Sequence, residues 1–150
     1  LKGSEYYDIR LRNLSKNQES KEVIKETTGS ILFSYDSKYF FYSKLDTNHR
    51  PKEIYLHKIG TSQNKDILIY KENFQRFSVS IETTSDKKFY IINSGDHSTN
   101  KCYLLNVNLK IIKTSLFYDY KENITYSLDS WNNNFYINFC FIHTHNHFFS

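Results

Sequence analysis

The densest group of residues that could do chemistry lies in the segment LDTNHRPKEIYLHKIGTSQNKDILIYKE, residues 45–72. Asp46, His49, Arg50 and His57 fall within a dozen positions of one another. A carboxylate and a histidine that fold together can act as an acid and a base, or as ligands of Zn²⁺. The segment therefore raises the hypothesis of a hydrolytic or metal-binding cluster.

The same residues also fit a purely structural role. Pro51 lacks a backbone donor and fixes φ, which suits the start of a strand after a turn. In that turn, Asp46 can accept hydrogen bonds from backbone amides, and Arg50 is placed to pair with it. His57 alternates with Tyr55 and Ile59 on one face of the following strand, as a packed, hydrogen-bonded ring would. We favour this interpretation, so the sequence predicts no catalytic residue here.

A second candidate is the histidine series His143, His145 and His147. On a strand these side chains would share one face, where neutral imidazoles could bind Zn²⁺. No carboxylate follows to complete or orient such a site, so no metal site is predicted. Cys102 and Cys140 are too few and too far apart for a disulfide framework or a cysteine-based metal site.

The charge distribution is typical of a solvated surface. The chain has 20 Lys and Arg against 16 Asp and Glu, a net charge of +4, and its cations are scattered singly among acidic residues. A nucleic-acid surface usually clusters its cations, so no nucleic-acid partner is predicted. The aromatic strands could instead stack on single-stranded bases, but core packing accounts for them more economically.

Several other functional classes lack their sequence signals. The glycines at positions 3, 29, 60 and 95 each stand alone, so there is no glycine-rich phosphate loop and no G-x-S-x-G nucleophile elbow. No apolar run approaches 18 residues, so no membrane-spanning segment is predicted. The sequence therefore predicts no cofactor, and we expect a cytoplasmic protein.

Short runs rich in β-branched and aromatic residues, separated by turn-forming clusters, predict an all-β fold. Helical periodicity is not sustained over any segment of eleven residues. The predicted strands are Tyr6–Leu11, Ile31–Tyr35, Tyr39–Lys44, Glu53–Ile59, Ile67–Lys71, Phe77–Ile81, Phe89–Asn93, Tyr103–Val107, Ile111–Phe117, Ile124–Leu128 and Phe135–Phe139.

Two patterns narrow the architecture. Residues 39–42, 67–70 and 89–92 are apolar on both strand faces, which predicts sheets covered on both sides. In addition, an apolar strand, a polar turn and an aromatic strand recur three times, as ILFSYDSKYFFY, FSVSIETTSDKKFYII and ITYSLDSWNNNFYINF, with starts 46 and 47 residues apart. Four strands per unit at this spacing are typical of β-propeller blades. A two-sheet sandwich would not explain a constant spacing.

With this repeat in view, the segment at 45–72 resembles the N-terminal propeller of oligopeptidase B, or protease II, in the prolyl oligopeptidase family of serine peptidases. The segments YDIRLRNL, DSKYFFY and TSDKKFYIINSG resemble flanking strands of the same family, and the similarity covers roughly residues 5 to 138. The matching positions are Asp46, Arg50-Pro51, Ile54-Tyr55, His57, Gly60-Thr61, Asp66 and Leu68 to Glu72.

The resemblance implies a partial propeller of about three four-stranded blades, at about 31–71, 77–117 and 124–150, within one incomplete N-terminal domain spanning 1–150. Residues 140–150 form a tail that departs from the family pattern. In this family the catalytic Ser, Asp and His belong to a separate α/β-hydrolase domain, and the propeller admits only short peptides. The resemblance thus implies cleavage after basic residues by the intact enzyme and no activity of this chain alone.

Two expectations concern partners. The chain begins with Leu1 and contains no Met, which favours a trimmed start or a piece of a longer reading frame. Three blades would leave two apolar sheet faces and unpaired edges open to water, favouring association or a second polypeptide that carries the missing blades and the hydrolase domain. The alternative function is a stand-alone β-repeat module that binds a protein or peptide.

Overall fold

The computed structural model describes residues 5–109 and 112–141, and these residues form three antiparallel sheets. Strands adjacent in sequence pair with one another within each sheet. The first sheet contains β1 (Tyr7–Asn13), β2 (Gln18–Phe33), β3 (Tyr39–Leu45), β4 (Pro51–Lys58) and β5 (Ile67–Lys71). The second contains β6 (Ser78–Thr83), β7 (Phe89–Gly95), β8 (Asn100–Asn106) and β9 (Thr114–Tyr118). The third contains β10 (Ile124–Trp131) and β11 (Asn134–Phe141), and a short 3₁₀ turn, η1 (Gln63–Lys65), precedes β5.

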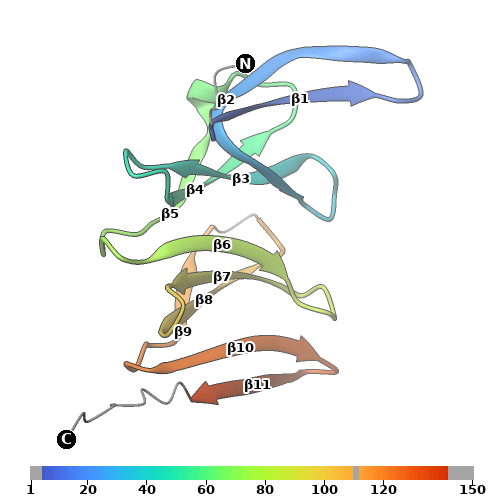
Figure 1. Ribbon diagram of the computed structural model, residues 1–150. Helices are drawn as coiled ribbons and strands as arrows, with labels where there is room; N and C mark the ends of the chain where they lie inside the picture. The colour runs from blue at the N-terminus through green and yellow to red at the C-terminus, as the bar shows by residue number, and fades with distance from the viewer. Residues whose placement is uncertain (1–4, 110–111, 142–150) are drawn as a thin grey trace, which may run out of the picture.

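The sheets are stacked face to face in chain order, with the first sheet at one end and the third at the other (Figure 1). This arrangement confirms the predicted all-β, partial-propeller fold. The predicted unit at 31–71 contains four strands, the second half of β2 with β3, β4 and β5, and the second sheet contains four strands as predicted. Within the described residues the first sheet has five strands and the third has two. The extra strand is β1, which pairs with the first half of β2 outside the predicted unit at 31–71.

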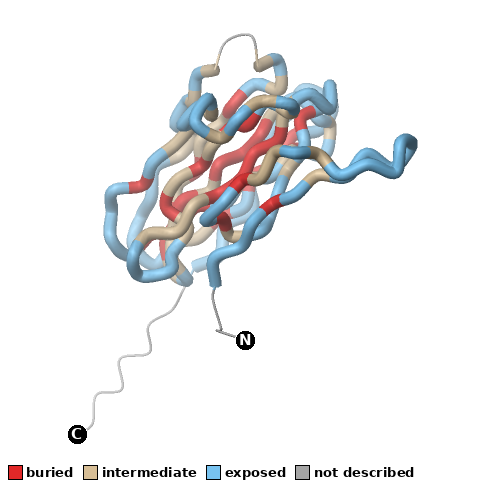
Figure 2. The backbone as a smooth tube through the Cα atoms, turned by 90° about the horizontal axis from the view of Figure 1, so that it is seen from above, coloured by how far each residue is buried: buried red, intermediate tan, exposed pale blue. Residues whose placement is uncertain are grey.

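The strand β2 bends sharply and pairs with two other strands. Its first half pairs with β1, and its second half pairs with β3 after an irregular step between Thr27 and Ile31. Gly29 adopts a φ of +83° within this step, a conformation that glycine accepts without strain. The buried Thr27 hydroxyl donates to the carbonyl of Tyr7, at 2.9 Å, and holds the corner. The resulting β1–β2 hairpin projects from the stack as an exposed arm (Figures 1 and 2).

The repeat seen in the sequence is also a repeat of turn geometry. In the first sheet, the Ser34 hydroxyl donates to Asp36 at 2.7 Å, and the Ser34 amide donates to the carbonyl of Tyr39. In the second sheet, Thr84 makes the equivalent bonds to Asp86 and to the carbonyl of Phe89. These hydroxyl-to-carboxylate turns close the β2–β3 and β6–β7 hairpins in the same way. The third hairpin uses a tighter turn.

The core lies between the sheets, where Figure 2 shows the buried residues concentrated. Phe41 of β3 packs with Tyr90 of β7 in the cluster that joins the first two sheets. On the opposite face of β3, Phe40 and Tyr42 pack against Ile9 and residues of the β1–β2 hairpin. The predicted burial of β3 on both faces is therefore confirmed.

Two expectations about exposed surface need correction. The outer face of the first sheet is not bare, because the β1–β2 hairpin covers Phe40 and Tyr42. The strand β5 is not buried on both faces, since Ile67 and Leu68 are each 46% exposed. It forms the outer edge of its sheet, where only one neighbouring strand supplies cover.

Candidate functional site

The structure separates the residues of the first candidate cluster. Asp46 lies in the turn before β4, where its carboxylate accepts the amides of Asn48 at 2.8 Å and Arg50 at 3.0 Å. Hydrogen bonding from the Arg50 amide, with that of Asn48, lowers the pKa of Asp46. The Arg50 side chain does not complete a pair with Asp46 but donates to the carbonyl of Gln75 at 2.8 Å. His49 lies on the surface beside Glu5. The turn is thus structural.

His57 is a buried, hydrogen-bonded ring, as predicted, but its partners form a polar cluster that the sequence did not indicate. Its Nδ1 lies 2.7 Å from Asp66 Oδ1, and its Nε2 lies 3.4 Å from Glu22 Oε2. Tyr42 donates its hydroxyl to the other oxygen of Asp66 at 2.8 Å. Glu22 also accepts the amide of Gly60 at 2.7 Å. The cluster fastens β2 and the β4–β5 connection onto β4.

We expect the substitution His57→Ala to lower the free energy of unfolding by about 2 kcal/mol, because two buried carboxylates lose a hydrogen-bonding partner. His49→Ala is the matched control, since His49 is exposed and its ion pair with Glu5 contributes little. Urea unfolding monitored by circular dichroism measures both variants. Equal stability of the two variants would contradict the structural role of His57.

A second polar site joins the first and second sheets through the connection between β5 and β6. Lys52 is 8% exposed, and its ammonium donates to the carbonyls of Phe74 at 2.8 Å and Gln75 at 2.9 Å. It also bonds the carbonyl of Phe77. One cation therefore binds three backbone acceptors of the crossover, and the hydrogen bond to the carbonyl of Phe77 is buried, so that carbonyl cannot be left unpaired without cost.

Glu72 fixes the start of the same crossover to the second sheet. It accepts the Ser94 hydroxyl at 2.6 Å and lies 3.0 Å from the Lys101 ammonium, on β7 and β8. The amide of Phe74 and the hydroxyl of Tyr70 also donate to it. Burial on its own would raise the pKa of Glu72, but these donors outweigh burial and lower the pKa to about 2. The carboxylate is therefore held ionised inside the interface.

The second and third sheets are joined by neutral and charged hydrogen bonds. The Tyr126 hydroxyl accepts the amide of Cys102 at 2.7 Å and donates to the carbonyl of Tyr118 at 2.6 Å. At the turn of the second hairpin, the Ser130 hydroxyl donates to Asp86 at 2.6 Å. Burial raises the pKa of the Cys102 thiol, which keeps it protonated and unreactive.

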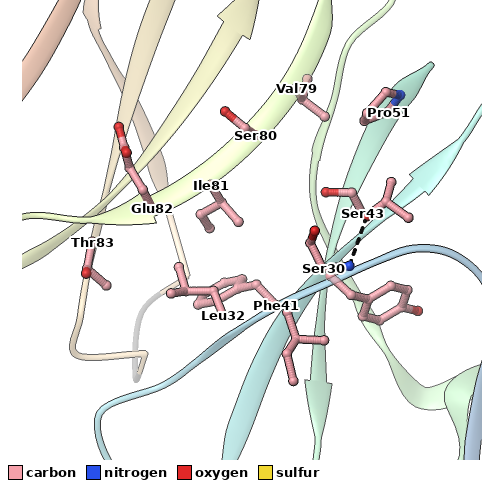
Figure 3. Close-up of a pocket in the computed structure, with 13 residues that line it drawn as sticks. Ser30, Leu32, Phe41, Ser43, Pro51, Val79, Ser80, Ile81, Glu82 and Thr83 are labelled. Carbon is pink, nitrogen blue, oxygen red and sulfur yellow. Dashed lines mark hydrogen bonds between the residues drawn. The ribbon is translucent and has the colours of Figure 1, made fainter. Parts of the chain in front are cut away.

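Clefts lie between successive sheets. The cleft between the first and second sheets has a volume of about 520 Å³ and mixes apolar side chains such as Leu32 and Ile81 with hydroxyls such as Ser30 and Ser80 (Figure 3). A further cleft of about 500 Å³, between the second and third sheets, is lined in part by Glu82 and Asp129. Burial, together with the charge of Asp129, raises the pKa of Glu82.

The remaining candidates are metal ligands, thiols and membrane segments. Residues 5–109 and 112–141 contain no group of three His, Cys, Asp or Glu that could hold a metal ion. His143, His145 and His147 lie outside the described residues. Cys102 is buried and Cys140 exposed, and both are free thiols. Within the same residues, no helix is long and apolar enough to cross a membrane.

Comparison with known protein families identifies the family of this chain. Residues 1–143 match the family model described as prolyl oligopeptidase, N-terminal beta-propeller domain. The chain belongs to this family. The match includes all three stacked sheets, and it confirms the resemblance that the segment at 45–72 and the repeat had indicated.

The relatives are much longer proteins. Protease 2 of Moraxella lacunata is 21% identical over 131 residues, which are 86% of this chain but 19% of that protein. Dipeptidyl aminopeptidase BI of Pseudoxanthomonas mexicana is 28% identical over 91 residues, 60% of this chain and 13% of that protein. The chain thus spans about a fifth or less of the length of these curated relatives.

Solved structures show the same fold. Oligopeptidase B from Leishmania major superimposes with a TM-score of 0.79 at 22% identity, covering 84% of this chain and 18% of that one. Oligopeptidase B from Trypanosoma brucei, with covalently bound antipain, gives a TM-score of 0.74 at 22% identity and covers 78% of this chain and 17% of that one. The three stacked sheets correspond to the N-terminal propeller portion of such proteins.

Proposed function

We propose that this chain is the first part of the gating propeller of an oligopeptidase-B-like serine endopeptidase. The observation that carries the proposal is the stack of propeller-type sheets within a family match covering residues 1–143. In this role residues 1–150 act as one incomplete N-terminal propeller domain, which restricts entry to short, unfolded peptides. The chain supplies no catalytic residue.

Chemistry in this proposal is supplied by a second polypeptide that carries the remaining blades and the α/β-hydrolase domain. Peptides with basic residues are the proposed substrates. The pair of carboxylates Glu82 and Asp129, which line one inter-sheet cleft, supports this choice because acidic walls attract cationic peptides. The free thiols of Cys102 and Cys140 are consistent with the proposed cytoplasmic location, where thiols stay reduced.

We expect the purified chain to show no hydrolysis of a peptide with a basic residue at the cleavage site. Co-expression with a polypeptide that carries the missing blades and the hydrolase domain is expected to restore hydrolysis that a serine-directed inhibitor abolishes. The fluorescence of a peptide–aminocoumarin substrate measures both. Inhibitor-sensitive hydrolysis by the chain alone would contradict the proposal that a second polypeptide supplies the catalytic residues.

A stand-alone β-repeat module that binds a protein or peptide is the second candidate. It is favoured by one observation, the cover that the β1–β2 hairpin gives to the first sheet, because a capped end needs no further blade beside it. Affinity capture from the source cell separates the candidates. Recovery of a hydrolase-domain polypeptide supports the peptidase role, and recovery of an unrelated protein supports the binding module.

A further inference from the structure

His57, Asp66 and Glu22 form a buried polar cluster whose hydrogen bonds require a particular number of protons. The side chain of His57 is 0% exposed, that of Asp66 is 2% exposed and that of Glu22 is 8% exposed. One ring nitrogen of His57, Nδ1, lies 2.7 Å from Asp66 Oδ1, and the other, Nε2, lies 3.4 Å from Glu22 Oε2. Both ring nitrogens therefore face a carboxylate oxygen inside the protein.

A neutral imidazole cannot serve both contacts. It offers one N–H donor and one lone pair, whereas an ionised carboxylate only accepts hydrogen bonds. With a neutral ring, one nitrogen would direct its lone pair at a carboxylate oxygen, and the low dielectric of a buried site would strengthen that repulsion. A positively charged ring, with a proton on each nitrogen, donates to Asp66 and Glu22 together.

The two carboxylates have no other positive charge to balance them. Among the described residues, no Lys or Arg forms an ion pair with Glu22 or Asp66. Glu22 accepts the backbone amide of Gly60 at 2.7 Å, and its second oxygen is buried without a hydrogen-bond partner in the described part of the chain. Buried charges are stable only when they are paired, so the ring of His57 is the group that can supply the cation.

The other titratable groups beside the cluster are neutral phenols. Tyr42 of β3 donates its hydroxyl to Asp66 at 2.8 Å, and Tyr55 of β4 stacks on Tyr42. Burial raises the pKa of Tyr42, and burial together with the hydrogen bond to Glu53 raises the pKa of Tyr55 to about 12. Both phenols therefore stay protonated over the pH range in which an imidazole titrates.

We propose that His57 carries a proton on both ring nitrogens, and that the contact between β2 and β4 therefore depends on pH. The ring lies on β4, Glu22 lies in the first half of β2, and Asp66 immediately precedes β5. Loss of the proton from Nε2 leaves a lone pair facing Glu22, which weakens the attachment of β2 and of the turn at Gly60. The inference does not rest on the proposed peptidase role.

The stability that this contact contributes is lost as the pH rises. In an unfolded chain a histidine loses its second ring proton near pH 6.5, at about the value of a model peptide. Above this pH the folded state binds one proton more than the unfolded state. The unfolding equilibrium constant therefore rises about tenfold per pH unit for as long as the folded ring keeps its proton. A carboxylate that is stabilised in its ionised form, such as Glu72, contributes in the opposite direction.

The first test reads the protonation of the ring directly. In the isotope-labelled chain, the NMR shifts of the two ring nitrogens distinguish an N–H group from a lone pair. At pH about 7.5, one unit above the ordinary histidine value, we expect both nitrogens of His57 to be protonated. His97 is exposed and serves as the internal reference, since most of its rings are expected to be neutral at this pH. A single protonated nitrogen on His57 would overturn the proposal.

The second test compares His57→Gln with the matched control His97→Gln. Urea unfolding between pH about 6.5 and about 8.5 gives the unfolding equilibrium constant of each variant and of the wild type. We expect this constant to rise about tenfold more per pH unit in the wild type than in His57→Gln, because glutamine binds no proton. His97→Gln is expected to keep the wild-type dependence. The same pH dependence in the wild type and in His57→Gln would overturn the proposal, and the ring shifts of the wild type decide it if His57→Gln does not fold.

Discussion

Replacing Lys52 by methionine is expected to lower the free energy of unfolding by about 3 kcal/mol, because three backbone carbonyls lose the Lys52 ammonium, although two of them keep another donor. Those carbonyls belong to Phe74, Gln75 and Phe77, in the crossover from the first sheet to the second. Methionine retains most of the side-chain length but cannot donate a hydrogen bond. The effect is therefore expected to come from the lost polar contacts rather than from a cavity.

Lys71→Met is the control for this prediction. Lys71 is at the end of β5, and its ammonium pairs with Glu53 on an exposed part of the same sheet. Exposed pairs contribute at most about 1 kcal/mol. Urea unfolding of both variants gives the comparison, and a similar loss in both would show that the crossover does not depend on Lys52. A large loss confined to Lys52→Met would show that joining the sheets dominates the stability of the stack.

The sequence carried most of the information about strands. Runs rich in aromatic residues placed β3, β7 and β11 within a few residues of their observed bounds, because each run is bracketed by turn-forming residues. The Asp36 and Asp86 turns repeat the same local hydrogen bonds, so the repeat was visible before any tertiary contact was known. Local chemistry was sufficient for these features.

The features that were missed depend on tertiary structure. The first half of β2, with the sequence QESKEVIKETTGS, is charged and does not alternate, and it is a strand because β1 pairs with it. The burial of Lys52 and Glu72 could not be predicted from the sequence either, since their partners lie 22 to 25 residues away or on the next sheet. A hydrogen bond from a side chain to a distant carbonyl leaves no periodic pattern in the sequence.

The interpretation of the candidate site also depends on tertiary structure. Asp46, His49, Arg50 and His57 are near one another in sequence, but only His57 enters a buried polar cluster, with Asp66 and Glu22. Two buried carboxylates around one imidazole resemble a catalytic arrangement when residue types alone are considered. Here His57, Asp66 and one oxygen of Glu22 hold strands together, while the other oxygen of Glu22 is buried and has no hydrogen-bond partner among the described residues.

Low pH is expected to destabilise the interface between the first and second sheets, because Glu72 becomes protonated. Its folded-state pKa of about 2 lies below its ordinary value of 4.5, so the folded state holds the ionised form more strongly than the unfolded state does. The stabilisation is fully present above pH 4.5 and is lost as the pH falls from there toward about 2. A shift of this size corresponds to about 3 kcal/mol.

Glu72→Gln separates this contribution from general acid unfolding. The variant cannot ionise and leaves the half-buried Lys101 ammonium without its counter-charge, so we expect it to be about 3 kcal/mol less stable at pH 7. Its stability is also expected to fall less steeply than that of the wild type between pH 4.5 and 2, because Glu72 no longer takes up a proton on unfolding. Glu19→Gln, which alters an exposed pair with Arg10, is expected to retain the steeper wild-type profile. Urea unfolding at a series of pH values gives the free energy of unfolding of all three proteins. If it depends on pH in the same way in the wild type and in Glu72→Gln, this carboxylate does not stabilise the interface between the sheets.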